Sequence, residues 1–265
     1  MPQRVIGRIV VCGVVAAAAS LLGATGGAQQ SAPADKGHWV MATLVTVQPG
    51  TGADYVEFQK NEVIPAQKKG GLPGRTAYSS GVFGETGTFA FFTPVTSLAA
   101  FDGESPVRKA LGAEGAAALG ARGAKLTAAR RVLLARTRPD LSYNPDPNAA
   151  PSPLALVTRV EIAPGKRGEF ETLVKKHVVP VMQQAKVKSY QMLEVVYGDA
   201  GGTYFSAVGY DTYEAIGKGH PFQIVLGEEG AKRLEANFTG VVTRLERFVV
   251  RYRADLSFAS TPPTN

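Results

Sequence analysis

The fold of this chain is decided by a stretch that occurs twice, RTRPDLSY at residues 136–143 and RYRADLSF at 251–258. Both copies read Arg-x-Arg-x-Asp-Leu-Ser-aromatic, and the offset between them is 251 − 136 = 115 residues. The same offset places LGAEGAAALGA at 111–121 on LGEEGAKRLEA at 226–236, and the Pro-Gly pair at 49–50 on the pair at 164–165. Because one register holds across the whole unit, the sequence predicts a tandem duplication.

The two copies are flanked and separated by segments that lack the periodic apolar pattern of helices and strands. The predicted divisions are a signal peptide at 1–28, a flexible leader at 29–37, a first repeat at 38–143, a linker at 144–153, a second repeat at 154–258 and a flexible tail at 259–265. The linker, NPDPNAAPSP, has the Pro and Asn content of a connecting segment. Each repeat has the length of an ordinary domain.

The N-terminus has the pattern of a secretory signal peptide. Arg4 and Arg8 precede the apolar run IVVCGVVAAAASLLG, and small residues follow, so we expect cleavage after Ala28. The mature protein would then be exported, periplasmic or secreted, without stable membrane insertion. An uncleaved anchor is the alternative, because the apolar segment approaches spanning length. A lipid anchor on Cys12 is disfavoured, since the apolar run continues past that residue.

Composition excludes several classes of site and partner. Hydrophobic residues make up 45% of the chain, which is typical of a folded protein. Cys12 is the sole cysteine, so the mature chain would hold no disulfide, thiolate metal site or cysteine nucleophile. The net charge is +7, but the basic residues are scattered, and we expect no nucleic-acid partner.

Within each repeat the apolar periodicity switches between strand and helix values. In the second repeat, LALVTRVEI alternates as a strand, and KRGEFETLVKKHVVPVMQQA has the period of an amphipathic helix. Two further strands, a second helical region over 212–238 and the closing strand VVTRLERFVVRYR follow. The first repeat has the same order. The predicted fold class is therefore α+β, with two tandem ferredoxin-like βαββαβ units.

Two such units in succession resemble the dimeric α+β barrel superfamily, which includes antibiotic-biosynthesis monooxygenase-like and NIPSNAP-like domains. The resemblance implies that the two sheets pack face to face as an intramolecular pseudo-dimeric barrel. It rests on the order of elements and on the duplication. No catalytic signature of the group is matched, so the resemblance assigns no catalytic residue.

Strand alternation identifies side chains that could line this barrel. In the first strand of the second repeat, Arg159 and Glu161 share a face with Val157, opposite the set that should pack on the helices. In the closing strands the more apolar set was expected to face the helices, which leaves the arginines for the interior. The candidate ligand-binding residues are Arg136, Arg138, Arg159, Glu161, Arg251 and Arg253. Clustered guanidinium groups could hold a carboxylate or phosphate. The alternative is that these arginines pair with Asp140, Asp255, Glu161 or Glu194, or lie in solvent.

Two histidines are further candidates. His177 is expected on the apolar face of a helix and His220 just before Pro221, and both occur only in the second repeat. They could form an acid/base pair or ligate haem. The alternative interpretation is a histidine at the core edge and another in a loop. No metal-ligand spacing is present, so we expect no metal site and no cofactor, with haem as the alternative.

Three functions fit these observations. The first is an exported protein that binds a small apolar or anionic ligand between its two halves. The second is an enzyme, either a cofactor-free monooxygenase-like protein or a haem-dependent relative. The third is an interaction scaffold with a filled barrel. The state of the barrel interior distinguishes them, and the sequence leaves the oligomeric state open.

Overall fold

The structure is a computed structural model that describes residues 37–259. The predicted signal peptide at 1–28, and all but the end residues of the leader and the tail, lie outside the described residues. Within the described part of the chain, no helix is both long and apolar enough to cross a membrane.

The first half follows the predicted β-α-β-β-α-β order. Its elements are β1 (Trp39–Val47), α1 (Gly52–Phe58), the π-helical turn η1 (Gln59–Val63), α2 (Ile64–Lys69), β2 (Gly74–Ser80), β3 (Thr88–Val95), the 3₁₀ turn η2 (Leu98–Phe101), α3 (Pro106–Leu126), β4 (Thr127–Thr137) and the 3₁₀ turn η3 (Pro139–Leu141).

The second half repeats this order at the offset of 115 residues. Its elements are β5 (Leu154–Ile162), α4 (Arg167–Leu173), the π-helical turn η4 (Val174–Val178), α5 (Val179–Gln184), β6 (Tyr190–Tyr197), β7 (Thr203–Tyr210), α6 (Tyr213–Gly217), α7 (Pro221–Ala236), β8 (Val242–Tyr252), the 3₁₀ turn η5 (Ala254–Leu256) and the short β9 (Phe258–Ala259). β1 and β5, β4 and β8, and the two π-helical turns have identical bounds once the offset is applied. The predicted pair of ferredoxin-like units is confirmed.

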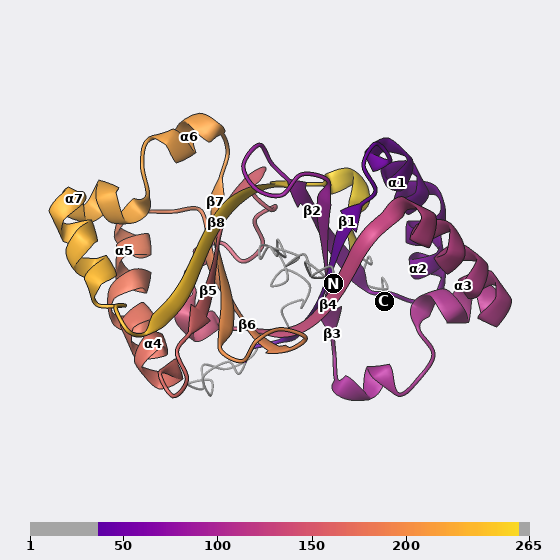
Figure 1. Cartoon of the computed structure of the whole chain (residues 1–265), viewed down its shortest axis with the longest axis horizontal. Coiled ribbons are helices and arrows are strands. Elements are labelled where there is room, and N and C mark those ends of the chain that lie inside the picture. Colours follow the sequence, from indigo (N-terminus) through magenta and orange to yellow (C-terminus); the bar gives the residue numbers. More distant parts are fainter. Residues whose placement is uncertain (1–36, 260–265) are drawn as a thin grey trace, which may run out of the picture.

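The two sheets close into one antiparallel barrel of eight strands with the helices outside (Figure 1). Within the halves, the hydrogen-bonded orders are β4-β1-β3-β2 and β8-β5-β7-β6. Between the halves, β4 pairs with β6 and β2 pairs with β8. Each seam therefore joins the outer strand of one half to the outer strand of the other, which confirms the intramolecular barrel.

Apolar side chains from both halves fill the barrel interior. The cluster includes Val40, Tyr78, Leu133, Ala135, Val157, Leu193, Phe205, Phe248 and Val250. For β5 the predicted faces are confirmed, because Val157 belongs to this cluster while Val160 packs against the helices.

For β4 and β8 the predicted faces are wrong. Leu133 and Ala135, with Phe248 and Val250, point into the barrel instead of toward the helices. Arg136, Arg138, Arg251 and Arg253 accordingly do not line the interior. Alternation groups side chains into two sets but does not say which set faces inward. Apolar side chains from both halves fill this barrel and leave a guanidinium group there unsolvated, so the apolar set takes the interior.

The helices cover the outer face of each sheet and bury a second apolar layer. In the second half, Phe170, Val174 and Val178 pack from the helices onto the sheet. His177, predicted on this apolar face, is exposed. The π-helical turn over Val174–Val178 accounts for the error, because its wider turn shifts every later side chain around the helix axis.

The repeated LGxEG sequences bend the long helices rather than continue them. Gly112 in α3 and Gly227 in α7 have φ of 71° and 68°, a left-handed conformation that favours glycine. Both helices therefore change direction at the same register position.

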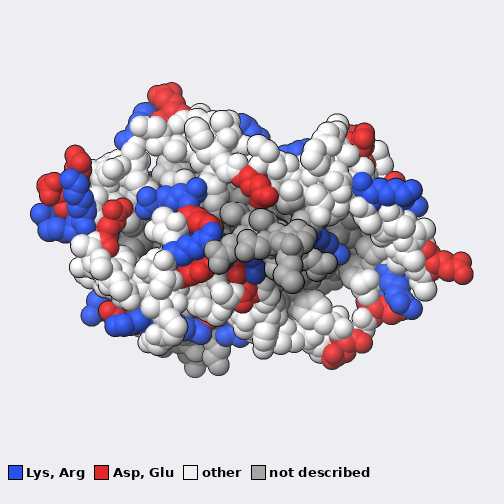
Figure 2. All heavy atoms as spheres, viewed as in Figure 1, with Lys and Arg blue, Asp and Glu red and all other residues white. Residues whose placement is uncertain are grey.

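Charges of both signs are interspersed over the face of the molecule shown in Figure 2. This face has no patch of a single sign.

Candidate functional site

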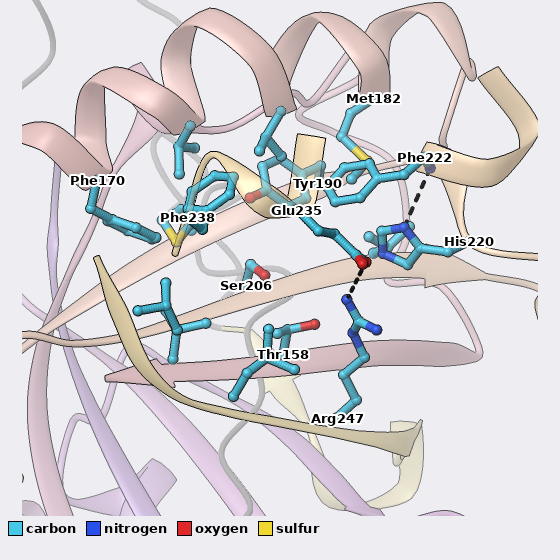
Figure 3. A pocket seen from close by; sticks show the side chains of 17 residues that line it. Thr158, Phe170, Met182, Tyr190, Ser206, His220, Phe222, Glu235, Phe238 and Arg247 are labelled. Atoms are coloured by element: carbon cyan, nitrogen blue, oxygen red, sulfur yellow. Dashed lines mark hydrogen bonds and ion pairs between the residues drawn. The ribbon is translucent and has the colours of Figure 1, made fainter. Parts of the chain in front are cut away.

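A cavity of about 330 Å³ lies in the second half, between the outer face of the sheet and the helices (Figure 3). Its lining is mostly apolar: Val160, Phe170, Val174, Val178, Met182, Tyr190, Met192, Val208, Phe222, Phe238, Val242 and Leu245. The strands supply one wall and α4, η4, α5 and α7 supply the other. Such a space is within the size range of small-molecule sites.

Polar groups lie at two places in this cavity. Thr158 and Ser206 are on the sheet wall, where Ser206 lines the cavity together with Tyr190. Burial raises the pKa of Tyr190, so its hydroxyl remains protonated. At the other end, Glu235 and Arg247 form an ion pair of 3.7 Å and lie beside His220. Glu235 and Arg247 are exposed, whereas the apolar lining is mostly buried or half-buried, apart from the exposed Leu245.

His220 caps the N-terminus of α7. Its Nδ1 accepts a hydrogen bond from the Phe222 N–H at 3.3 Å, and Gln223 Oε1 accepts one from the His220 N–H at 3.2 Å. Ser105 plays the same part for α3, where its hydroxyl accepts from the Arg108 N–H. A polar cap at this register position is therefore common to both halves. The imidazole ring of His220 occurs only in the second half, since the first half has a serine at this position.

The cap determines how His220 can act. Since Nδ1 is the acceptor of the neutral ring, the hydrogen must be on Nε2, which can then donate to a bound molecule. Burial, with a smaller contribution from Arg247, lowers the pKa of His220 to about 4. The ring is therefore uncharged at neutral pH and acts as a hydrogen-bond donor.

We expect His220 to weaken the fold as the pH falls from about 6.5 to about 4. Because the folded-state pKa is lowered, the unfolded chain binds the proton first, so stability is complete above this window and is lost through it. A shift of this size corresponds to at most about 3 kcal/mol. Urea unfolding near neutral pH and at about pH 5 measures the loss. His220→Ser is the matched control, since serine keeps the cap as Ser105 does but does not titrate. Equal pH dependence in the two proteins would contradict the assignment.

Arg159 and Glu161 lie at one end of the barrel, in a group of ion pairs. Arg159 is buried and contacts Glu161 at 2.6 Å, Asp199 at 3.1 Å and Glu246 at 3.7 Å. Arg131 contacts the same aspartate at 2.7 Å. The carboxylates neutralise the charge of Arg159, in line with the alternative interpretation of the sequence, while its buried Nε has no hydrogen-bond acceptor among the described residues. The ion-paired residues line none of the described cavities.

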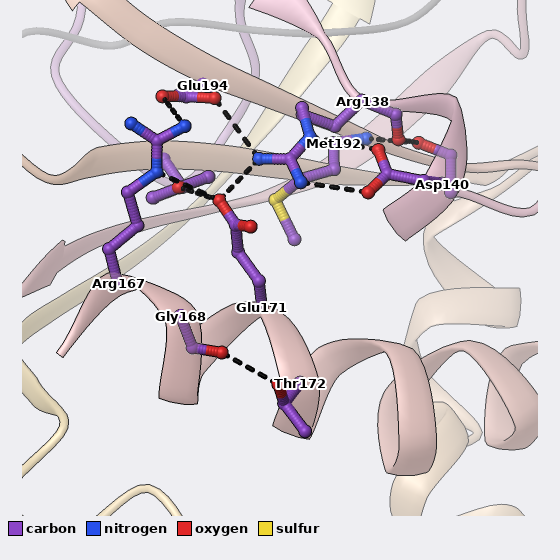
Figure 4. Close-up of polar contacts among 10 residues, drawn as sticks. Arg138, Asp140, Arg167, Gly168, Glu171, Thr172, Met192 and Glu194 are labelled. Carbon is purple, nitrogen blue, oxygen red and sulfur yellow. Dashed lines mark hydrogen bonds and ion pairs between the residues drawn. The ribbon is translucent and has the colours of Figure 1, made fainter. Parts of the chain in front are cut away.

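Arg138 joins the two halves outside the barrel (Figure 4). Its guanidinium contacts Asp140 at 2.8 Å, Glu171 of α4 at 2.5 Å and Glu194 of β6 at 3.1 Å. Arg167 bridges the same two glutamates of the second half. Hydrogen bonding to Arg138 lowers the pKa of Glu171 to about 2, so this carboxylate is charged at any ordinary pH.

The remaining candidate arginines have separate surroundings. Arg253, at the position that corresponds to Arg138, pairs with Asp255 at 2.7 Å. The guanidinium of Arg136 lies 4.3 Å from the ring centre of Trp39, and Arg251 is exposed. The structure does not bring these arginines together, so it provides no shared anion site of the predicted kind.

Replacing Arg138 by methionine should destabilise the protein by about 3 kcal/mol, because Glu171 and Glu194 would lose the more buried of their two arginine partners and keep only the exposed Arg167. Arg253→Met is the matched control and should cost less than about 1 kcal/mol, since it removes one half-exposed pair. Urea denaturation of both variants measures the difference. Similar losses would mean that the seam does not depend on Arg138.

Sequence reasoning missed Glu235, Arg247 and Ser206 as lining residues. A signal for them was present in the duplication, because the first half has Gly120, Val132 and Phe91 at those positions. In this chain, a difference in polarity between corresponding positions of the two copies marks residues that line the cavity. His220 was identified as a candidate by such a difference. Tyr190 both lines the cavity and belongs to the apolar core of the second half.

The histidines do not suit a haem iron. His177 is exposed and lies outside the cavity, and the acceptor nitrogen of His220 is engaged by the Phe222 N–H. A ligating histidine usually donates its other ring N–H to an acceptor, which is the reverse of the arrangement at His220. Among residues 37–259 no group of three His, Cys, Asp or Glu side chains could hold a metal ion.

Comparison with known proteins shows that this chain shares its fold with solved structures, at low sequence identity. No family model matches the chain, and no curated protein matches it. Solved structures do match. An anthrone oxidase-like protein has a TM-score of 0.58 at 12% identity, covering 87% of this chain and 97% of that one. A Fusobacterium nucleatum protein assigned by inference as a monooxygenase has a TM-score of 0.57 at 10% identity, with 82% and 93% covered.

A mutant chlorite dismutase from Candidatus Nitrospira defluvii has a TM-score of 0.51 at 12% identity, covering 82% of this chain and 92% of that one. At such identities the likeness concerns the arrangement of the backbone. It confirms the predicted resemblance to the dimeric α+β barrel superfamily, and this chain carries both halves of that barrel.

Proposed function

We propose that this protein binds a small, mostly apolar molecule in the cavity of its second half. The ligand would place its apolar body between the helices and the sheet and its polar end against His220 and Arg247. One observation supports this most: apolar side chains make up most of the lining, and the charged lining residues Glu235 and Arg247 lie together at one end. Apolar pockets with a few convergent polar groups are the usual sites of small ligands.

The space between the two halves suits a ligand less well. The barrel interior is occupied by a cluster that includes Tyr78, Phe205 and Phe248, and the Arg159 ion pairs occupy one end. A filled barrel is also what the scaffold hypothesis expected. We nevertheless favour binding, because the cavity lies outside the barrel and does not depend on space within it.

Catalysis is the weaker alternative for this cavity. A general base needs an unengaged acceptor atom directed at the substrate. Nδ1 of His220 is engaged in the helix cap, and Glu235 is exposed and paired with Arg247. The cavity therefore offers hydrogen-bond donors more readily than a base, which suits recognition of a carbonyl or similar acceptor on the ligand.

A neutral apolar dye such as N-phenyl-1-naphthylamine tests the proposal, because its fluorescence rises in apolar surroundings. Thr158→Phe would fill the cavity from the sheet wall and should weaken dye binding at least about tenfold. Thr43→Phe is the matched control at the corresponding position of the first half and should change the affinity less than about twofold. Loss of binding in Thr43→Phe with no loss in Thr158→Phe would refute the proposed site.

We also propose that the mature protein functions outside the cytoplasm, on the basis of its N-terminal sequence pattern. Expression of the full chain in a Gram-negative host should yield an exported protein that begins at Gln29, as measured by cell fractionation and mass spectrometry. Replacing Arg4 and Arg8 by glutamate should retain the precursor in the cytoplasm. An exported protein that still carries residues 1–28 would support the membrane-anchor alternative.

A further inference from the structure

The first half contains a cavity at the place that corresponds to the second-half cavity. Its volume is about 530 Å³, and it lies between the sheet of the first half and α1, η1, α2 and α3. Of the seventeen positions that line the second-half cavity, fourteen line this one as well once the offset of 115 is applied. The duplicated fold therefore builds the same space twice.

The two cavities differ in chemistry at several corresponding positions, and three of these form one hydrogen-bonded group around Arg75. Where the second half has Tyr190, Val174 and Met182, the first half has Arg75, Gln59 and Gln67. A cation with two amide groups thus replaces an uncharged, largely apolar surface. The fold does not require a charge at this position, because the second half adopts the same structure with Tyr190.

Arg75 is held firmly by neutral partners. Its Nε donates to the Leu256 carbonyl at 3.0 Å, and its Nη1 donates to Gln59 Oε1 at 2.9 Å and to Gln67 Oε1 at 3.1 Å. The guanidinium lies 4.3 Å from the ring centre of Phe91. These contacts come from β3, from the helical layer and from the C-terminal turn η5, so the position of the group is fixed from three sides.

The charge of Arg75 is nevertheless uncompensated within the described chain. The residue is 3% exposed, its Nη2 has no hydrogen-bond acceptor among residues 37–259, and no carboxylate of those residues pairs with it. Burial lowers the pKa of Arg75 to about 10, which leaves it protonated at neutral pH. A buried cation without an anionic partner is strongly destabilising. Arg159 and Arg138, by contrast, each contact more than one carboxylate.

We propose that the first-half cavity is a second binding site, which takes an organic monocarboxylate with an apolar body. The carboxylate would accept hydrogen bonds from the two Nη2 hydrogens of Arg75, because Nε and Nη1 already donate theirs to Leu256, Gln59 and Gln67. The apolar body would fill the space lined by Met41, Val45, Phe58 and Leu119. A single buried cation matches one negative charge, and the apolar walls favour a carboxylic acid over inorganic phosphate.

Octanoate and its uncharged analogue octanamide test this site, with isothermal titration of the mature protein as the measurement. Octanoate should bind at least about tenfold more tightly than octanamide to the wild type. Arg75→Met keeps the length of the side chain but removes the charge, and it should abolish that preference. Its thermal unfolding without ligand shows that it is folded, and removal of an unpaired buried charge should not lower its melting temperature.

The variants used for the dye separate this inference from the proposed function. Thr43→Phe should block octanoate and leave dye binding intact, whereas Thr158→Phe should do the reverse. The carboxylate site is refuted if wild type binds octanamide as tightly as octanoate, if it binds neither, or if it binds inorganic phosphate instead. It is also refuted if Arg75→Met retains the preference for octanoate. If that variant does not fold, the wild-type comparison and Thr43→Phe still decide the question.

Discussion

Closure of the barrel is the constraint on which the rest of the structure depends. A four-stranded sheet has two open edges, and each open edge exposes unpaired backbone N–H and C=O groups. Here β4 pairs with β6 and β2 pairs with β8, so each half supplies the hydrogen bonds that the outer strands of the other half lack. Neither half could satisfy its sheet alone. The sheet wall of each cavity therefore depends on the presence of both halves.

Closure also decides where charges can lie. The interior is enclosed by backbone and filled by apolar side chains, so ionisable groups are found at the barrel end or on the outer face. At the end, Arg159 is surrounded by carboxylates, and on the outer face Arg138 serves as a contact between the halves. Both are paired arginines, which removes them as ligand-binding candidates. Arg75 differs from them because its partners are neutral.

Much of the fold could be predicted from the sequence, because a common register of 115 residues relates every element of the two halves. The site was harder to predict. Alternation assigned Val157 correctly but could not decide which face of β4 or β8 points inward. Helical periodicity placed His177 on the apolar face of its helix, because it assumes a regular helix and does not account for a π-helical turn.

The cavities themselves arise from packing between layers, which no local pattern encodes. Their distinctive residues do have a signal in the sequence, namely a polar side chain in one copy opposite an apolar or small one in the other. Arg75 opposite Tyr190 and Glu235 opposite Gly120 are examples. His220 shows the limit of this signal, because its capping role is shared with Ser105 and only its ring is specific.

Duplication within one chain limits the destabilisation that a buried charged side chain causes, because the side chain can be present in one half only. In a symmetric dimer, a substitution that buries an unpaired cation would occur in both subunits, so the dimer would lose stability at two places. In a single chain with two halves the substitution occurs once, while the barrel retains the closure that both halves provide. An uncompensated charge can cost several kcal/mol, a large part of the net stability of a protein of this size. A tandem barrel can therefore carry a charged cavity in one half and an apolar cavity in the other, a combination that a symmetric dimer cannot reach by single substitutions.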